Sequence, residues 1–529
     1  KSYLSGIDKD TAHTAAGVAS SVASIVTNGV PSLSTGKTFT LTTNTDSFTG
    51  TTGKDVFQGV FVGNAGTGTT IKSGDSTVGG EGVDTLNISV TGASAAAQAI
   101  EGINSDVEKI LFSNYDTDTT QNRTHTFNAS LADGVTTVGL SSSNDNGDTL
   151  FTNLKNIVSA EMSNGSSDLS ISHIDSATKG DSDSATLTLS GAIKGASVVP
   201  TFTETAPSGT GGLETLSVTS SGSANNVNIT SGQNSLETVN VSGDQNLTTE
   251  ITSTSLKTVD ASSFTGKLDV TYAAAVDLTV KGGSGNDTVT FSADNFTSAD
   301  TVDGGAGTDV LEINSAVTAA TLLKKVSNVE TLKFVAGSAH DVTLAADANV
   351  MNFDFTSTGA NLLTLNTGVE GAVSATFGIT GADQVNNAAN IALTVKGSAT
   401  AIDTSTLITG GSKTDIIEIT ADTEADAAID IAGGNITKVE TITIVDGGDA
   451  TTGSTKLSGK DINLTTGAYA TALTIDGSAL DAANKDNDSD GDIDNSDTSA
   501  EKLTVDGSSA TGKLTITGGG AGDSITGGT

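Results

Sequence analysis

The feature that most constrains the fold of this chain is a nine-residue pattern of glycine and aspartate that recurs along it. The pattern reads G-G-x-G-x-D-x-U-x, in which U is a large apolar residue. Three segments match every defined position: Gly79–Asn87, Gly282–Thr290 and Gly304–Glu312. Three others depart from it at a glycine position: Gly50–Gln58, Gly410–Glu418 (with Lys413) and Gly518–Thr526 (with Ala521). Each copy predicts a tight glycine turn that leads into a short strand.

The repeat register extends beyond these copies. Stepping nine residues back from Gly50, Gly79 and Gly304 places Asp46, Asp75 and Asp300 at the aspartate position. Stepping nine forward from Gly518 reaches Gly527 and Gly528, so the last residue lies inside a repeat and we expect the native protein to continue. A single copy is typical of a plain hairpin turn, but several copies in register favour stacked turns.

The chemistry of the pattern indicates calcium. Glycine tolerates the positive φ of such a turn, its carbonyls point inward, and the aspartate adds charge. Calcium takes about six to eight oxygen ligands and one turn supplies about half, so we expect sites between neighbouring turns. The candidate calcium residues are Asp46, Gly50, Gly53, Asp55, Asp75, Gly79, Gly80, Gly82, Asp84, Gly282, Gly283, Gly285, Asp287, Asp300, Asp303, Gly304, Gly305, Gly307, Asp309, Gly410, Asp415, Gly518 and Asp523.

A second calcium pattern occupies residues 486–497, DNDSDGDIDNSD. It fits the EF-hand loop D-x-[DN]-x-[DN]-G-x₅-E, with an aspartate in place of the final glutamate. Its candidate ligands are Asp486, Asp488, Asp490, Asp492, Asp494 and Asp497. The alternative is a solvated acidic loop. Loops 115–120, 142–148 and 179–184 are more typical of plain polar turns than of calcium sites.

Nucleotide sites and common catalytic sites do not fit. No long amphipathic helix follows any glycine copy, as a dinucleotide fold requires, and Pro31 stands where a Walker loop needs glycine. The four histidines lie in no H-E-x-x-H motif and are interpreted as surface or strand residues. There is no G-x-S-x-G motif. We therefore predict that the chain is not an enzyme.

Strand spacing favours a solenoid. Leu213, Leu236 and Leu256 begin similar segments (LETLSV, LETVNVS and LKTVDAS) at separations of 23 and 20 residues. A period near 20 is typical of coils in a parallel β-solenoid, whereas an antiparallel sandwich is the alternative. Residues 10–29 predict a short N-terminal helix that ends at Asn28-Gly29.

Composition agrees with thin stacked layers held by cations. Aromatic residues make up 4% of the chain, cysteine is absent, and the net charge is −38. Such a charge excludes nucleic acid as a partner and requires neutralisation, for which divalent metal is the obvious candidate. No run of 18 apolar residues occurs, so we predict no membrane span.

We therefore predict an all-β, multi-domain chain of β-solenoid or β-sandwich modules linked by short calcium-binding parallel β-roll segments. The predicted divisions are 1–40 (end of an upstream helical region and linker), 41–90 (first β-roll segment), 91–280 (β-rich domains), 281–315 (second β-roll segment), 316–409 (β domain), 410–420 (degenerate β-roll segment), 421–517 (β domain carrying the EF-hand-like loop) and 518–529 (start of a further β-roll segment).

Three repeats are followed, about two dozen residues on, by V-E-x-[IL], at Glu108, Glu330 and Glu440. With these motifs, the acidic, cysteine-free sequence resembles the calcium-dependent surface-layer proteins of Gram-negative bacteria that carry repeats-in-toxin motifs. The resemblance implies multiple Ca²⁺ ions, type I secretion and an extracellular location on the cell surface. It also implies self-assembly into a two-dimensional lattice, and attachment to lipopolysaccharide through regions outside this chain. The alternative is a calcium-dependent adhesin that binds a host or environmental ligand.

Overall fold

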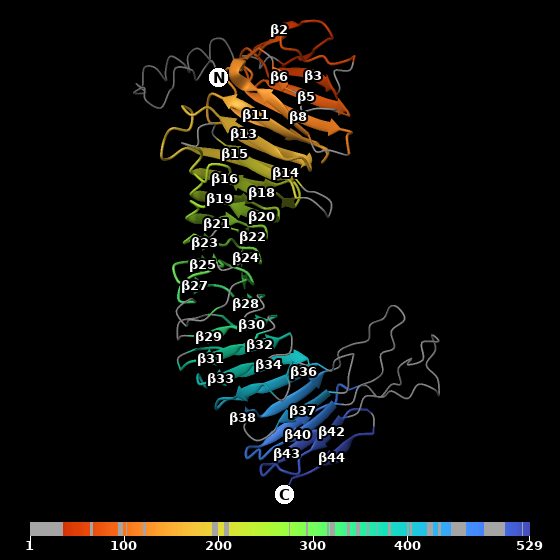
Figure 1. The fold of residues 1–529 in the computed structure, drawn as a ribbon, viewed down its shortest axis with the longest axis vertical. Coiled ribbons are helices and arrows are strands. Elements are labelled where there is room, and N and C mark those ends of the chain that lie inside the picture. Colours follow the sequence, from red (N-terminus) through yellow and green to blue (C-terminus); the bar gives the residue numbers. More distant parts are fainter. Residues whose placement is uncertain are drawn as a thin grey trace, which may run out of the picture. The chain divides into compact units, whose positions relative to one another are not determined.

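The computed structural model divides the chain into two compact units, Lys1–Leu256 and Lys257–Thr529, which are taken separately below (Figure 1). It describes residues 35–63, 67–93, 99–101, 103–119, 123–192, 199–205, 211–273, 276–292, 295–314, 317, 323–335, 339–344, 350–356, 359–367, 369–378, 382–398, 401–402, 405–420, 427–431, 435–445, 462–480, 503–520 and 522–528. The predicted N-terminal helix and the EF-hand-like loop lie outside these ranges.

Three parallel sheets form the coils of the first unit. One contains β1 (Thr38–Thr40), β3 (Val56–Val62), β5 (Thr85–Gly92), β8 (Lys109–Asp116), β10 (Thr137–Ser141), β12 (Ser159–Gly165), β14 (Ser184–Ala192), β16 (Thr215–Ser221) and β19 (Thr238–Gly243). The second contains β6 (Ala99–Glu101), β9 (Arg123–Asn128), β11 (Gly147–Leu154), β13 (Leu169–His173), β15 (Thr201–Thr205), β17 (Asn225–Asn226), β18 (Asn228–Ser231) and β20 (Leu247–Thr252). The third contains β2 (Ser47–Thr49), β4 (Ser76–Val78) and β7 (Ile103–Ser105), and the 3-10 turn η2 spans Ala129–Leu131.

Four parallel sheets form the second unit. The first contains β21 (Thr258–Phe264), β23 (Thr279–Lys281), β25 (Thr301–Asp303) and β27 (Val326–Ser327). The second contains β22 (Leu268–Tyr272), β24 (Thr288–Phe291), β26 (Val310–Ile313), β28 (Thr331–Phe334), β30 (Asn352–Phe355), β32 (Val373–Phe377), β34 (Leu393–Ser398), β36 (Ile416–Thr420), β39 (Thr441–Val445), β41 (Leu473–Asp476) and β43 (Leu514–Thr517). The third contains β29 (Asp341–Leu344), β31 (Leu362–Leu365), β33 (Gln384–Asn387), β35 (Leu407–Thr409) and β38 (Ile436–Thr437), and the fourth contains β37 (Ala427–Ile431), β40 (Ile462–Thr466), β42 (Leu503–Asp506) and β44 (Ser524–Thr526).

The strands follow from a two-residue alternation of small polar and apolar side chains. In β16, Leu216 and Val218 point inward while Thr215, Ser217 and Thr219 point outward, because successive side chains of a strand face opposite sides. The pairing of Leu216 with Val239 in β19 repeats this pattern one coil later. The predicted all-β, parallel β-solenoid is confirmed, and the antiparallel sandwich does not describe these strands. The division into eight segments stays a prediction.

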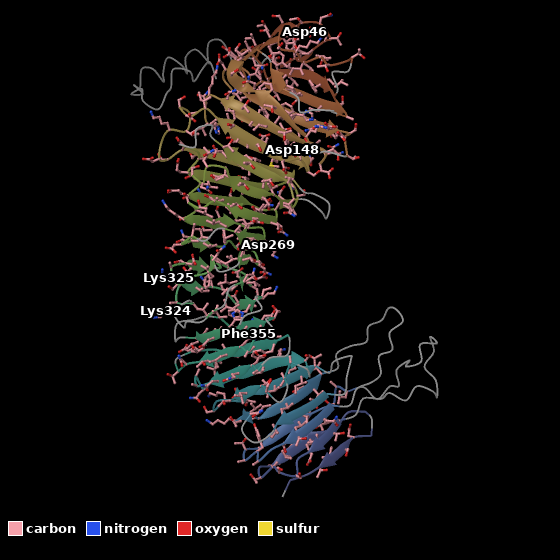
Figure 2. The ribbon with its side chains drawn as sticks, viewed as in Figure 1. Asp46, Asp148, Asp269, Lys324, Lys325 and Phe355 are labelled. Carbon is pink, nitrogen blue, oxygen red and sulfur yellow. The ribbon has the colours of Figure 1, made fainter. Side chains whose placement is uncertain are left out.

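Interior side chains stack from coil to coil. In the second unit, the rings of Phe334 and Phe355 lie 4.9 Å apart and those of Phe355 and Phe377 lie 5.1 Å apart, nearly parallel in both pairs. Figure 2 shows Phe355 within the ribbon, whereas the exposed Lys325 projects from its edge. Such aromatic pairs contribute about 0.5–1.5 kcal/mol each beyond the area they bury. Within the described residues, no helix has the length and apolarity needed to cross a membrane.

Candidate metal centre in the glycine–aspartate corners

Each glycine–aspartate copy forms a corner, meaning the turn that joins strands of two sheets within one unit. Gly282–Asp287 joins β23 to β24, and Gly304–Asp309 joins β25 to β26. Because β23 pairs with β25 and β24 with β26, these two corners stack directly on each other. In the first unit, Gly50–Asp55 and Gly79–Asp84 stack in the same way through the pairs β2–β4 and β3–β5.

Close stacking explains the glycines. A Cβ added to Gly305 would lie 2.3 Å from the carbonyl oxygen of Gly283, and one added to Gly307 would lie 2.2 Å from that of Gly285. Their φ values of +96° and +134° are also left-handed, a region that side chains disfavour. Gly80 and Gly82, at +94° and +134°, repeat this arrangement in the first unit. The main chains can approach this closely because these four glycines carry no side chain.

Carboxylates tie consecutive corners together. The N–H of Asp287 donates to Oδ1 of Asp309 at 2.7 Å, and the N–H of Asp55 donates to Oδ1 of Asp84 at 2.7 Å. Each aspartate therefore accepts the main-chain N–H of its counterpart in the preceding coil. Hydrogen bonds to a charged acceptor are among the stronger ones, so the row stabilises the stack.

The glutamates of the V-E motif continue this row. The N–H groups of Asp84, Asp309 and Asp415 donate to Oε2 of Glu108, Glu330 and Glu440 at 2.8, 2.7 and 2.8 Å. Each glutamate thus occupies the corner position of the next coil. Sequence reasoning noted the recurring spacing but missed this role. A spacing close to one coil length was the signal that could have revealed it.

The corners fall into two kinds. In Gly50–Asp55, Gly282–Asp287 and Gly410–Asp415, Oδ2 of the aspartate accepts an N–H of its own turn, from Thr51, Gly283 and Gly411. We call these closed corners. In Gly79–Asp84 and Gly304–Asp309, Oδ2 of Asp84 and of Asp309 is buried and has no hydrogen-bond partner among the described residues. We call these two open corners; the first unit contains one and the second unit contains the other.

Negative charge accumulates at the open corners. Burial, together with the nearby carboxylates of Asp287, Glu330 and Asp303, raises the pKa of Asp309 to about 6. Burial likewise raises the pKa of Asp84, together with Glu108, Asp55 and Asp106. At the closed corner in the coil before Asp84, burial opposes ionisation of Asp55. Hydrogen bonds from Lys37 and Thr51 nevertheless hold the pKa of Asp55 below the usual value.

The oxygen atoms at the open corners suit calcium. A Cβ placed on Gly304 would lie 1.9 Å from the carbonyl oxygen of Asn328 and 2.7 Å from Oδ2 of Asp309, so both oxygens lie beside that glycine. At Gly79, the corresponding distances are 1.8 Å to Asp106 O and 2.5 Å to Asp84 Oδ2. Calcium prefers carboxylate and carbonyl oxygens, and a buried carboxylate without a donor is costly unless a cation or proton satisfies it. The residues present therefore fit the ion.

This fit depends on carbonyl groups and not on a side-chain cluster. Among the described residues, no group of three or more His, Cys, Asp or Glu side chains is placed to hold a metal ion. Asp106 and Asn328, whose carbonyls face the open corners, both adopt left-handed φ values of 50°. These two residues occupy the same place before Glu108 and Glu330, which again makes the two corners equivalent.

The nine-residue register does not describe how aspartates stack. Asp300 leads β25 and Asp309 leads β26, so they head strands of different sheets, and the expectation that they form a neighbouring pair is wrong. One coil uses two or more strands, so stacked residues are separated by a full coil; Asp287 and Asp309 are 22 residues apart. Asp300 is itself closed, since it accepts N–H groups from Leu278 and Thr297.

Asp46 and Asp75 stack on each other, away from Asp55 and Asp84. The N–H of Asp46 donates to Oδ1 of Asp75 at 2.9 Å. Each second oxygen accepts a local N–H, from Thr42 and Lys72 respectively. Both positions are therefore closed, and their separation of 29 residues is one coil and not a multiple of nine.

Asp415 and Asp523, the other predicted aspartates of the repeat, each accept at Oδ1 an N–H group from a leucine and not from an aspartate of a preceding corner. Oδ1 of Asp415 accepts from the N–H of Leu393 and from Nδ2 of Asn387, so no glycine corner precedes it. Oδ1 of Asp523 accepts from Leu503. The EF-hand-like ligands Asp486, Asp488, Asp490, Asp492, Asp494 and Asp497 lie outside the described residues.

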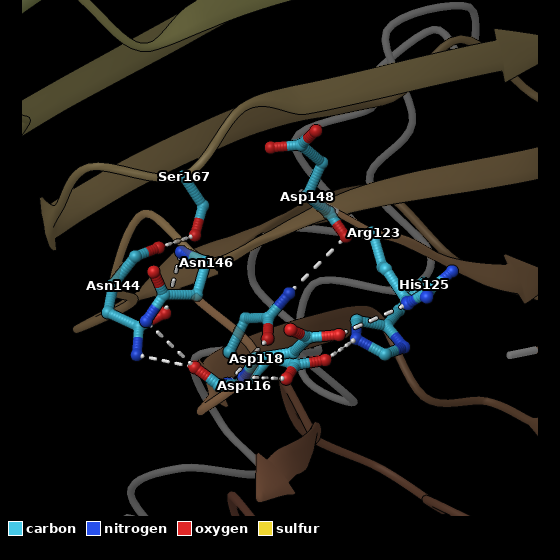
Figure 3. Close-up of polar contacts among 9 residues, drawn as sticks. Asp116, Asp118, Arg123, His125, Asn144, Asn146, Asp148 and Ser167 are labelled. Atoms are coloured by element: carbon cyan, nitrogen blue, oxygen red, sulfur yellow. Dashed lines mark hydrogen bonds and ion pairs between the residues drawn. The ribbon is translucent and has the colours of Figure 1, made fainter. Parts of the chain in front are cut away.

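Two of the weaker acidic loops meet in the first unit (Figure 3). Nδ2 of Asn144 and of Asn146 donate to the carbonyl of Asp116, at 2.9 and 3.2 Å. Oδ2 of Asp116 lies 3.0 Å from Nε2 of His125, and Oδ1 accepts the N–H of Asp118. Burial lowers the pKa of His125, although Asp116 opposes this. His125 and His173 lie in strands, as expected, but they are buried and not on the surface.

Comparison with known proteins returned no match: no protein-family model matches the chain, and no curated protein matches it. The chemistry of the open corners is therefore inferred from their geometry alone.

Proposed function

We propose that this chain is a structural protein of a bacterial surface layer, whose solenoid coils bind several calcium ions and assemble outside the cell. One observation carries the proposal. The open corner occurs in both units with the same left-handed glycines, the same glutamate one coil on, and the same buried carboxylate oxygen without a donor. A repeated arrangement of this kind is expected of a metal site and not of a chance turn.

The residues that would hold calcium are those that face the open corners. Asp84 and the carbonyl of Asp106 would contribute in the first unit, and Asp309 and the carbonyl of Asn328 in the second. When bound, the ion supplies positive charge that the surrounding carboxylates lack. Because the ligands come from consecutive coils, binding stabilises only the folded stack, and the binding free energy adds to the folding free energy.

Coupling of this kind suits a protein that leaves the cell before it folds. Extracellular calcium modules bind at about 10⁻⁴–10⁻³ M, far above cytosolic calcium levels. A chain with a net charge of −38 repels its own copies until cations neutralise it, so calcium would favour assembly as well as folding. Type I secretion and attachment to lipopolysaccharide through regions outside this chain are parts of the same proposal. We assign the chain no enzymatic activity.

Removal of calcium tests the proposal. The full chain is dialysed against EGTA and then titrated with calcium, with magnesium at equal ionic strength as the control. Circular dichroism follows β-structure, and electron microscopy follows sheets. We expect calcium, but not magnesium, to restore both. Unchanged spectra would contradict calcium-driven folding. Calcium-dependent spectra with monomers only would contradict the layer and favour the adhesin.

A further inference from the structure

A carboxylate lies inside the apolar interior of the first unit. The alternation of β15 points Phe202 and Glu204 inward, and Glu204 is only 4% exposed. Its neighbour in β13 is Ile171 and its neighbour in β18 is Ser231. A buried carboxylate is costly unless its oxygens are hydrogen-bonded, so its partners need to be accounted for one by one.

One oxygen of Glu204 has a partner and the other has none. Nε2 of His173 lies 3.4 Å from the N–H of Val158 and accepts from it, which leaves the ring proton on Nδ1. Nδ1 faces Oε1 of Glu204 at 3.4 Å and donates to it. Oε2 of Glu204 is buried and has no hydrogen-bond partner within the part of the chain that the structure describes.

The hydroxyl group of Ser231 is also incompletely bonded. Its oxygen accepts the N–H groups of Ser235 and Leu236, at 3.1 and 3.4 Å. Of the described residues, its proton meets only the hydroxyl of Ser235, at a long 3.5 Å, and that hydroxyl can already donate to the carbonyl of Leu213. Ser231 therefore has a proton to donate, in the coil next to an oxygen that needs one.

A small cavity lies beside both groups. It has a volume of about 10 Å³ and is lined by Glu204, Ser231 and apolar side chains that include Phe202, Leu213 and Ile229. A buried water molecule needs about 10–15 Å³ and two or more polar partners. The cavity is thus large enough for one water molecule and too small for an organic ligand.

We propose that this cavity binds a single water molecule, which accepts the Ser231 hydroxyl proton and donates to Oε2 of Glu204. With the water in place, a continuous hydrogen-bonded row runs from Val158 through His173, Glu204 and the water to Ser231. It crosses the successive strands β13, β15 and β18 and ties three coils together through their interior. The site is independent of calcium, because none of its groups belongs to a glycine–aspartate corner.

A high-resolution crystal structure of the full chain tests the site directly. We expect one electron-density peak within hydrogen-bonding distance of Glu204 Oε2 and Ser231 Oγ. An empty cavity, or a direct hydrogen bond between the two side chains, would overturn the proposal. A peak with the short contacts and high coordination number of a metal ion would overturn it as well.

A double-mutant cycle tests the coupling in solution. Glu204→Gln and Ser231→Ala each break the row, so the decrease in Tm of the double variant should be smaller than the sum of the two single decreases. Ser253→Ala is the matched control, because that buried hydroxyl donates to the carbonyl of Leu236 and does not line the cavity. It should be additive with Glu204→Gln. Additivity of Ser231→Ala with Glu204→Gln would count against the bridging water.

Discussion

Two corners of the second unit, Gly282–Asp287 and Gly304–Asp309, match the same nonapeptide at every defined position and stack directly, yet they differ in hydrogen bonding. In the first, the N–H of Gly283 donates to Oδ2 of Asp287 and closes the corner. In the second, the corresponding N–H of Gly305 donates to Asp303, and no described residue donates to Oδ2 of Asp309. The motif alone therefore does not decide whether both oxygens of the aspartate have a donor; in this pair the difference lies in the direction of one peptide group.

In the second unit, the residue before the corner differs along with this hydrogen bond. Lys281 and Asp303 occupy paired positions in β23 and β25, directly before the closed and the open corner. Lys281 pairs with Asp260 at 2.9 Å and cannot accept an N–H, whereas the carboxylate of Asp303 can. The change from Lys281 to Asp303 thus accompanies the change from a turn in which Oδ2 of the aspartate is hydrogen-bonded to a candidate ion site.

The largest expected effect comes from forcing a side chain into the open corner. Gly307→Ala adds left-handed strain of about 1–2 kcal/mol and a contact with the carbonyl of Gly285 that costs about 1–3 kcal/mol more. Gly371→Ala is the matched control, because its φ is +88° and nothing lies within 4 Å of an added Cβ. Urea unfolding in calcium should show a clearly larger loss for Gly307→Ala. Equal losses would mean that close stacking is unimportant.

Removing the negative charge of the aspartate should lower calcium affinity more at the open corner than at the closed one. Asp309→Asn keeps the size of the side chain but removes the negative charge that a calcium ion needs, so calcium affinity at this corner should fall by about tenfold or more. Asp287→Asn, whose Oδ2 is already bonded to Gly283, should have a much smaller effect.

Isothermal titration calorimetry measures both variants, and Asp84→Asn with Asp55→Asn repeats the test in the first unit. A larger loss of affinity for the closed-corner variants would contradict the distinction between the two kinds of corner.

Redirecting one peptide group should convert an open corner toward a closed one. Asp303→Ala removes the acceptor of the Gly305 N–H, which is then free to donate to Asp309. We expect calcium affinity to fall several-fold with little loss of folded structure, measured by calorimetry and circular dichroism. Asp260→Ala, which removes a carboxylate at the surface of the same unit, is the control. Unchanged affinity for Asp303→Ala would show that the Gly305 N–H does not control the site.

The smallest expected effect is that of the ion pair beside the closed corner. Hydrogen bonds from Ser262 and Lys281 lower the pKa of Asp260 to about 2. Because the folded pKa is depressed, its contribution is complete above the unfolded value near 3.9 and is lost as the pH falls toward about 2. Lys281 is half exposed, so solvent screens the pair and we expect its contribution to stability to be small. Acid unfolding of Lys281→Gln should differ only slightly from that of the unmodified chain.

Much of the fold could be predicted because its determinants are local. The alternation of apolar residues with threonine and serine specifies strands, and the spacing of Leu213 and Leu236 gives the coil length that the pairing of β16 with β19 confirms. Glycine at Gly305 and Gly307 likewise indicates a tight turn without further information. These properties depend on side-chain periodicity and backbone freedom, which the order of residues expresses directly.

Which residues of successive coils stack on each other could not be predicted in the same way. Asp300 and Asp309 match the register but head strands of different sheets, whereas Asp287 and Asp309 stack because coil length, and not repeat length, sets which residues meet. Glu330 belongs to the same row, although its motif differs from the glycine pattern.

The sequence by itself determined a chain of parallel coils with acidic glycine corners, because each strand and turn depends on residues close together along it. Only the tertiary structure decided which corners stack and which of them keeps a carboxylate oxygen without a donor. The physical reason is that the carboxylate oxygens at a corner are satisfied by N–H groups from both its own turn and the preceding coil. A difference in one of these contacts, here the acceptor of a single N–H of the turn, is then enough to separate two copies of the same motif.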